Sequence, residues 1–136
     1  MNNLEIHITK SESQIISIET LGKEIWTLHY SPIIGINQVN YMLEKFQSKK
    51  AIQRQLEEGY IYYNISINKK DIGYFSVQPR SEKLFLSKVY LIEKQRGNGY
   101  FSQVLNFIED LAINLKINTI ELTVNKYNEQ SISIYK

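Results

Sequence analysis

The first half of the chain shows mainly helical spacing of its apolar positions. Residues 4–8 alternate between apolar and polar and predict a short strand. Apolar positions over residues 11–30 fit a helix, and Pro32 is expected to end it, because proline disfavours a helical residue before it. Helical spacing returns over residues 39–46 and again over 51–56.

The pattern changes to strands from residue 60 onward. Residues 60–67 and 72–77 predict two strands joined by an Asn-Lys-Lys-Asp turn, which is a hairpin signal. Residues 84–92 form a third strand that is apolar on both faces except for Ser87 and Lys88. Such a strand is expected where helices cover both faces of a sheet.

The clearest amphipathic helix follows over residues 101–115, and residues 119–124 alternate again as a strand. Asn128 is a good N-cap and Glu129 complements the helix dipole, so a last helix is expected to start there.

Composition removes several classes of function. The 136 residues predict a single domain spanning residues 1–136. The chain has no cysteine, two histidines and two aspartates, so we expect no metal site, no disulfide and no Ser-His-Asp triad. A net charge of +2 is too small to indicate nucleic-acid binding. No apolar run is long enough to span a membrane, and the first residues do not form a signal peptide, so we expect a cytoplasmic protein without a membrane partner.

A glycine-rich loop lies between the third strand and the amphipathic helix. Gly97 and Gly99 allow the backbone to approach a ligand closely. The N–H groups at the start of the helix would form an anion site, with Arg96 at its mouth. No Gly-Lys-Ser/Thr sequence is present, and Gln103 takes the place of the third glycine of a dinucleotide fingerprint. A plain strand-to-helix turn is the alternative.

The second half of the chain resembles the Gcn5-related N-acetyltransferase (GNAT) superfamily. The resemblance rests on the segment Lys88-Val-Tyr-Leu-Ile-Glu-Lys-Gln-Arg-Gly-Asn-Gly99, on the helix and strand that follow it, and on Asn128 and Tyr135. In that family the loop reads Gln/Arg-x-x-Gly-x-Gly/Ala, and Phe101 departs from it at the last position. The second signature, Asn-x-x-Ala-x-x-x-Tyr, is matched with serine in place of alanine.

The resemblance implies an α/β fold, with a mixed, mostly antiparallel twisted sheet flanked by helices. It also implies acetyl transfer from acetyl-coenzyme A to a primary amine, with Tyr135 as general acid or hydrogen-bond donor to the thiolate. The residues it assigns to cofactor binding are Val89, Tyr90, Leu91, Arg96, Gly97, Asn98, Gly99, Tyr100, Phe101, Ser102 and Asn128.

Several alternatives stay open at this point. The acceptor is expected to be a small amine or polyamine, with a protein N-terminus or lysine as the second choice. The general base is Glu57, Glu58, Glu93 or a water path. A non-catalytic acyl-coenzyme A binder, or a domain binding ATP or NAD, would share the loop. We expect a monomer or homodimer. The family usually continues with two more strands beyond the position of Lys136. Either the given sequence is incomplete, or these strands are absent or supplied from elsewhere.

Overall fold

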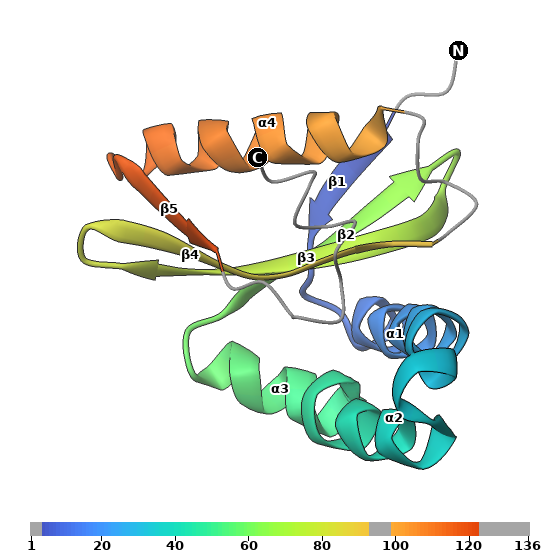
Figure 1. Ribbon diagram of the computed structural model, residues 1–136. Helices are drawn as coiled ribbons and strands as arrows, with labels where there is room; N and C mark the ends of the chain where they lie inside the picture. The colour runs from blue at the N-terminus through green and yellow to red at the C-terminus, as the bar shows by residue number, and fades with distance from the viewer. Residues whose placement is uncertain (1–3, 93–98, 123–136) are drawn as a thin grey trace.

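A five-stranded sheet lies between two layers of helices in the computed structural model, which describes residues 4–92 and 99–122 (Figure 1). The elements in chain order are β1 (Leu4–Ile8), α1 (Glu12–Ile34), α2 (Ile36–Met42), the π-helical turn η1 (Leu43–Gln47), α3 (Lys49–Glu57), β2 (Ile61–Ile67), β3 (Lys70–Arg80), β4 (Lys83–Leu91), α4 (Tyr100–Asn114) and β5 (Thr119–Leu122). None of these helices is long and apolar enough to cross a membrane.

The strands lie in the sheet in the order in which they occur in the chain. β1 to β4 pair antiparallel with their neighbours, and only β4 and β5 run parallel. A parallel pair needs a crossover connection, and α4 is part of it. Helix α4 covers one face of the sheet, and α1, α2 and α3 lie on the other (Figure 1). This arrangement confirms the predicted mostly antiparallel sheet flanked by helices.

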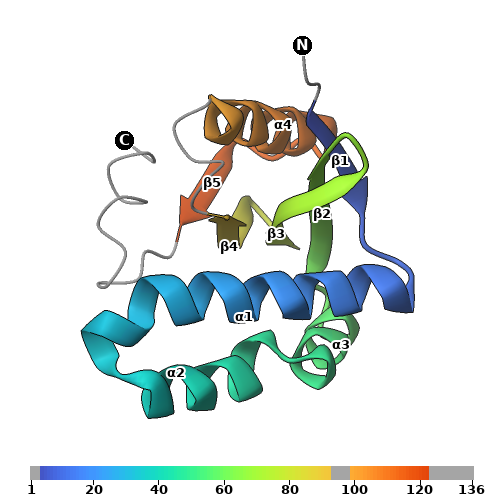
Figure 2. The same ribbon diagram turned by 90° about the vertical axis from the view of Figure 1, so that its right-hand side faces the viewer.

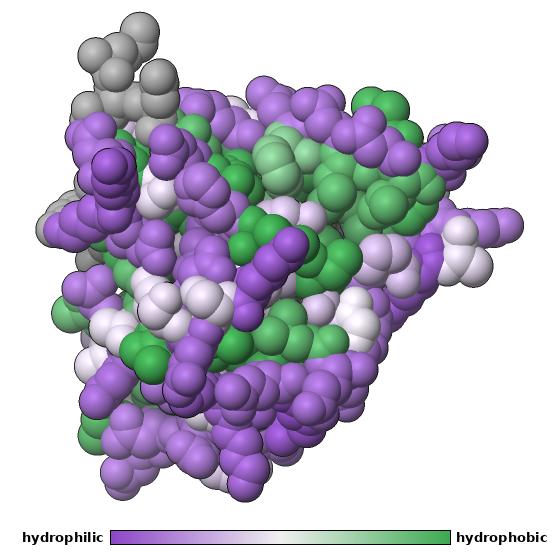
Figure 3. Space-filling model, turned by 180° about the vertical axis from the view of Figure 1, so that it is seen from behind, coloured by the Kyte–Doolittle hydropathy of each residue, from purple (hydrophilic) through white to green (hydrophobic). Residues whose placement is uncertain are grey.

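Alternate residues of the central strands pack against the two helical layers. Tyr63 and Phe75 stack at 4.8 Å between ring centroids and contact Phe107 of α4. Tyr62 and Tyr74 stack on the opposite face. Because both faces are covered, buried apolar side chains of the middle strands point to both sides of the sheet. Seen from behind, apolar surface is concentrated across the middle of the molecule, and the upper and lower rims are polar (Figure 3).

The predicted hairpin between β2 and β3 is confirmed, and its turn is tighter than expected. Asn68 and Lys69 both have positive φ, 52° and 67°, as the two central residues of a type I′ turn require. This turn fits the twist of the flanking strands, so β3 starts already at Lys70.

The prediction that Pro32 ends the first helix is wrong by less than one turn. Helix α1 continues through Pro32 to Ile34. Proline removes one main-chain hydrogen bond, the one to the carbonyl of Leu28. The Ser31 Oγ donates to the Thr27 carbonyl at 2.5 Å, and the Gly35 N–H donates to the Ser31 carbonyl at 2.9 Å, so the last turn keeps other bonds.

Candidate active site

Strand β4 and helix α4 contain the part of the predicted site that the structure describes. The residues Leu84, Leu86, Val89 and Leu91 of β4 are buried. The N-terminal half of the strand pairs in parallel with β5, from Lys83↔Thr119 to Leu86↔Leu122. Helix α4 lies over the face of the sheet beside these two strands (Figure 2).

A bulge divides β4 into two halves at Ser87. On β3, Ser76 pairs with Lys88 and the next residue, Val77, pairs with Leu86, so Ser87 has no partner in the ladder. A bulge bends its strand and increases the local twist. The half that pairs with β5 is therefore set at an angle to the half that carries Val89, Tyr90 and Leu91.

Gly73 of β3 lets the second half of β4 approach closely. It pairs with Leu91, and a Cβ atom at this position would lie 2.2 Å from the Tyr90 carbonyl oxygen and 2.8 Å from the Leu91 Cδ2. Only glycine can occupy this position without moving the segment predicted to bind the cofactor. The sequence analysis did not single out Gly73.

The N-terminus of α4 is left without a side-chain cap by Gly99, which adopts the left-handed conformation with φ 78°. Helices α1 and α3 begin differently, since Ser11 and Ser48 accept hydrogen bonds from the N–H groups of Gln14 and Ala51. Glycine has no such acceptor, and no described atom lies within 4 Å of the position of a Cβ at Gly99. No described side chain therefore caps the positive end of the α4 dipole, an arrangement that suits an anion.

The sequence predicts that the pyrophosphate of coenzyme A binds at this helix start, and this placement stays a prediction. Phosphate oxygens are acceptors that helix N-terminal N–H groups bind well. Ser102 is exposed in the first turn, while Tyr100 and Phe101 are half-buried and pack against the main core. The large Phe101 side chain thus lies against the core at the position where the family usually has glycine or alanine.

The predicted site residues fall into two groups. Val89, Tyr90 and Leu91 lie on β4, and Gly99, Tyr100, Phe101 and Ser102 lie at the start of α4, so the structure places both groups in one β4–α4 unit. The remaining predicted residues are outside the described residues and stay predictions. They are Arg96, Gly97, Asn98, Asn128 and Tyr135.

Lys88 is a residue of this region that the sequence analysis named but did not assign to the site. It follows the bulge, and its Nζ donates to the Phe46 carbonyl and the Tyr62 hydroxyl, both at 2.6 Å, and to the Gln55 Oε1 at 3.1 Å. The Nζ also lies 5.2 Å from the centroid of the Tyr62 ring. The one signal in the sequence is a lysine in the middle of an otherwise apolar strand.

Burial of the Lys88 ammonium lowers its pKa to about 7, and the nearby positive charge of Arg54 acts in the same direction. In the part of the chain that the structure describes, no carboxylate forms an ion pair with Lys88. Among the described residues, the half-buried Lys88 ammonium is met by neutral acceptors and not by a carboxylate, so burial disfavours its charged form.

This burial predicts that the protein becomes more stable as the pH rises above 7. Between pH 7 and about 10 the unfolded chain keeps the Lys88 proton that the folded chain has lost, so the free energy of unfolding should rise by up to about 1.4 kcal/mol per pH unit from this group. Urea unfolding at pH 7, 8 and 9 measures the slope. The slope should be absent from Lys88→Met, and equal slopes in both proteins would contradict the assignment.

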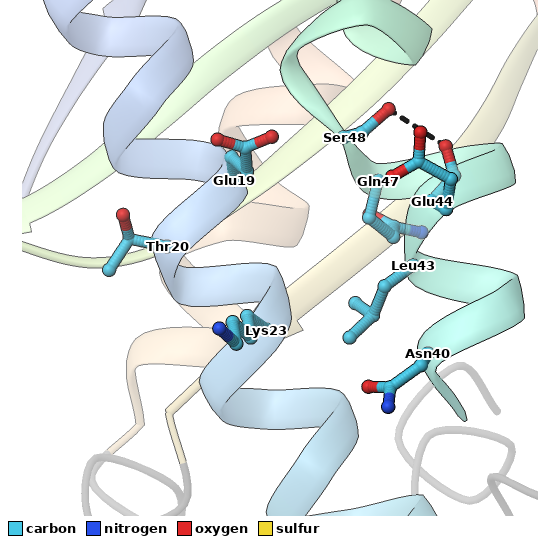
Figure 4. A pocket seen from close by; sticks show the side chains of 8 residues that line it. All are labelled: Glu19, Thr20, Lys23, Asn40, Leu43, Glu44, Gln47 and Ser48. Atoms are coloured by element: carbon cyan, nitrogen blue, oxygen red, sulfur yellow. Dashed lines mark hydrogen bonds between the residues drawn. The ribbon is translucent and has the colours of Figure 1, made fainter. Parts of the chain in front are cut away.

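A pocket of about 550 Å³ lies elsewhere, between α1 and the segment formed by α2 and η1 (Figure 4). One of its two carboxylates is already hydrogen-bonded within the protein. Glu19 accepts from the main-chain N–H of Lys49 at 2.7 Å and so caps α3. No residue predicted for cofactor binding lines it. The lining residues are Glu19, Thr20, Lys23, Asn40, Leu43, Glu44, Gln47 and Ser48.

Solved acetyltransferases have the same fold. The PaiA N-acetyltransferase from Thermoplasma acidophilum, solved with coenzyme A, is 17% identical, with a TM-score of 0.84 over 98% of this chain and 86% of its own. The aminoglycoside N-acetyltransferase AAC(6')-Iy, also with coenzyme A, is 13% identical, with a TM-score of 0.69 over 99% and 86%. Ribosomal-protein-alanine N-acetyltransferase from Brucella melitensis biovar Abortus 2308 is 9% identical, with a TM-score of 0.68 over 98% and 88%.

No curated protein shows a significant sequence match. A sequence model of the acetyltransferase (GNAT) family, however, matches residues 24–136, which is most of the chain and runs from the second half of α1 through β5 to the C-terminal segment. This match confirms the resemblance inferred from the loop and from the Asn128 and Tyr135 pattern. The chain belongs to the GNAT family of acetyltransferases.

Proposed function

We propose that the protein transfers the acetyl group of acetyl-coenzyme A to a primary amine, with a small amine or polyamine as acceptor. The glycine-capped N-terminus of α4, directly after β4, is the observation that carries this proposal. The coenzyme A bound in structures of similar fold supports the same cosubstrate.

The residues have separate roles in this proposal. The N–H groups at the start of α4, from Tyr100 to Ser102, would hold the pyrophosphate, with Arg96 balancing its charge. The main chain of β4 at Val89–Leu91 would bind the pantetheine arm, as a neighbouring strand would. Asn128 would contact the same arm near its end.

The reaction forms one amide bond and breaks one C–S bond. The neutral amine attacks the acetyl carbon, the coenzyme A thiolate leaves, and the amine proton passes to a base. Tyr135 would donate a hydrogen bond to the thiolate. Full proton transfer from a tyrosine of pKa near 10 to a thiolate of pKa near 8.5 is uphill by about 2 kcal/mol, which favours a hydrogen bond over complete transfer.

Aromatic side chains lie beside β4 on the face opposite α4. The Tyr90 ring is 6.3 Å from that of Trp26 and 5.5 Å from that of Tyr74, measured between centroids. Trp26 and Tyr74 are buried, so these rings pack in the core beside β4. Glu57 and Glu58 are exposed at the end of α3 and stay candidate bases, together with a water path and with Glu93, which lies outside the described residues.

Thermal unfolding with acetyl-coenzyme A, coenzyme A, ATP and NAD tests the cosubstrate. A ligand present at about 100 times its Kd should stabilise the folded protein by about 2.7 kcal/mol. We expect this shift with acetyl-coenzyme A, and an amine screen would then identify the acceptor. No shift with either form of coenzyme A would overturn the proposal.

Tyr135→Phe separates an enzyme from a non-catalytic binder in the same assay. The variant should bind acetyl-coenzyme A like the wild type, because the ring is kept, but should turn over more slowly. If the wild type binds acetyl-coenzyme A and shows no turnover with any amine tested, the protein is a binding module.

A further inference from the structure

The Lys88 side chain connects the bulge of β4 to three other elements. Its acceptors come from η1 (Phe46), α3 (Gln55) and β2 (Tyr62). An ammonium group has three N–H donors, so this set satisfies it completely. The acceptors are also bonded to each other, because Gln55 Nε2 donates to the Phe46 carbonyl at 3.2 Å and the Tyr62 hydroxyl donates to Gln55.

The Phe46 carbonyl explains why a cation is placed here. It lies at the C-terminal end of η1, where helical carbonyls have no partner further along the helix. Arg54 donates to the adjacent Lys45 carbonyl at 3.2 Å. Two cations thus satisfy two successive carbonyls at the negative end of this helical segment.

The position of Lys88 along β4 relates it to the reaction, if the proposed function holds. The pyrophosphate site at Gly99 lies beyond the C-terminal end of β4, and the pantetheine segment is Val89–Leu91. A cofactor that runs back along β4 from α4 therefore brings its acetyl end to the bulge at Ser87 and Lys88.

We propose that Lys88 is a positioning residue for acetyl transfer: its side chain fixes the bulge of β4, and with it the acetyl end of the cofactor site, against η1, α3 and β2. It acts through the main chain of β4 rather than by touching the substrate. The groups that face it are Arg54 of α3, the Tyr62 hydroxyl of β2 and Ser76, its partner on β3. On η1, the ammonium of Lys45 lies over the Tyr41 and Phe46 rings.

The protonation of Lys88 changes how firmly the bulge is held. The ammonium form donates to all three acceptors, and the neutral amine has only two N–H groups to give. The ratio of the wild-type kcat to that of an uncharged variant should therefore be largest below pH 7 and should decline above it.

Lys88→Met tests the proposal, because methionine keeps the stem of the side chain without the charge. We expect kcat to fall about tenfold or more, with the coenzyme A dissociation constant within about threefold of wild type, since the pyrophosphate contacts are untouched. Lys83→Met is the matched control. Lys83 lies on the same strand and is exposed, and among the described charged groups it contacts only Glu121, at 3.2 Å. The kcat of Lys83→Met should therefore match that of the wild type.

Two further variants keep the test decisive if Lys88→Met does not fold. Tyr62→Phe and Gln55→Leu each remove one acceptor without altering β4, and each should lower kcat more than coenzyme A affinity. A folded Lys88→Met with wild-type kcat and an unchanged pH profile would overturn the positioning role. A wild type that binds no coenzyme A would instead refute the proposed function itself.

Discussion

Gly73→Ala is expected to destabilise the protein by about 3 kcal/mol, at the upper end of the cost of overpacking. The added methyl group would lie 2.2 Å from the Tyr90 carbonyl oxygen, which belongs to the main chain of a central strand. A side chain could rotate away, but here β3 and β4 must separate. The melting temperature should fall by roughly 10 °C. Coenzyme A affinity should fall as well, because the displaced segment is the one proposed to bind pantetheine.

Gly22→Ala is the matched control for this substitution. A Cβ at Gly22 would meet the Tyr74 hydroxyl at 2.9 Å, which is the far end of a side chain. Alanine also favours the helix in which Gly22 lies, by about 1 kcal/mol. Tyr74 is buried and its hydroxyl donates to Gln47 at 2.7 Å, so this contact has a cost of its own, but the main chain need not move and the helix gain opposes it. The melting temperature should therefore fall less than in Gly73→Ala. Equal melting temperatures for Gly73→Ala and the wild type would show that the two strands are less closely packed than described.

Gly99→Val is expected to weaken coenzyme A binding by about 100-fold or more, which corresponds to about 2.7 kcal/mol. Valine is strained at a φ of 78°, at a cost of about 1–2 kcal/mol in stability. A Cβ at this position meets no described atom of the protein, and it would stand at the helix start to which we assign the pyrophosphate. Isothermal titration with coenzyme A measures the loss.

Gly35→Val separates the backbone strain from the loss of the site. Gly35 also has a positive φ, 87°, and open space around its Cβ position, but it lies between α1 and α2. The Gly35→Val variant should therefore be less stable than the wild type but bind coenzyme A with the same affinity. Unchanged affinity in Gly99→Val would show that the pyrophosphate binds elsewhere.

The sequence predicted those parts of the fold that are determined by local patterns of apolar, polar and turn residues. The amphipathic helix α4 and the hairpin of β2 and β3 are set by side-chain periodicity and turn residues. The course of α1 beyond Pro32 could not be predicted, because it depends on bonds such as that from Ser31 to Thr27. The π-helical turn η1 likewise depends on donors that come from other elements, Arg54 and Lys88.

The candidate site likewise has one part that local sequence predicts and another that depends on contacts between distant residues. The glycine loop and the start of α4 follow from residues close together in the chain, so the sequence indicated them. Gly73 and Lys88 matter through contacts with distant residues, Tyr90 in one case and Phe46, Gln55 and Tyr62 in the other. A single sequence does not show which strand lies beside which, and the importance of these two residues follows only from the sheet.

The sequential order of strands in the sheet also bears on how the protein folds. Strands β2, β3 and β4 are joined by turns at Asn68-Lys69 and at residues 81–82, so their contacts are local and need little loop closure. β1 reaches β2 only across the four helical segments α1, α2, η1 and α3, and β5 reaches β4 only across α4. We therefore expect the three-stranded meander to form first, with β1 and β5 added later. Substitutions in β4 would therefore slow folding, while those in β1 or β5 would mainly speed unfolding.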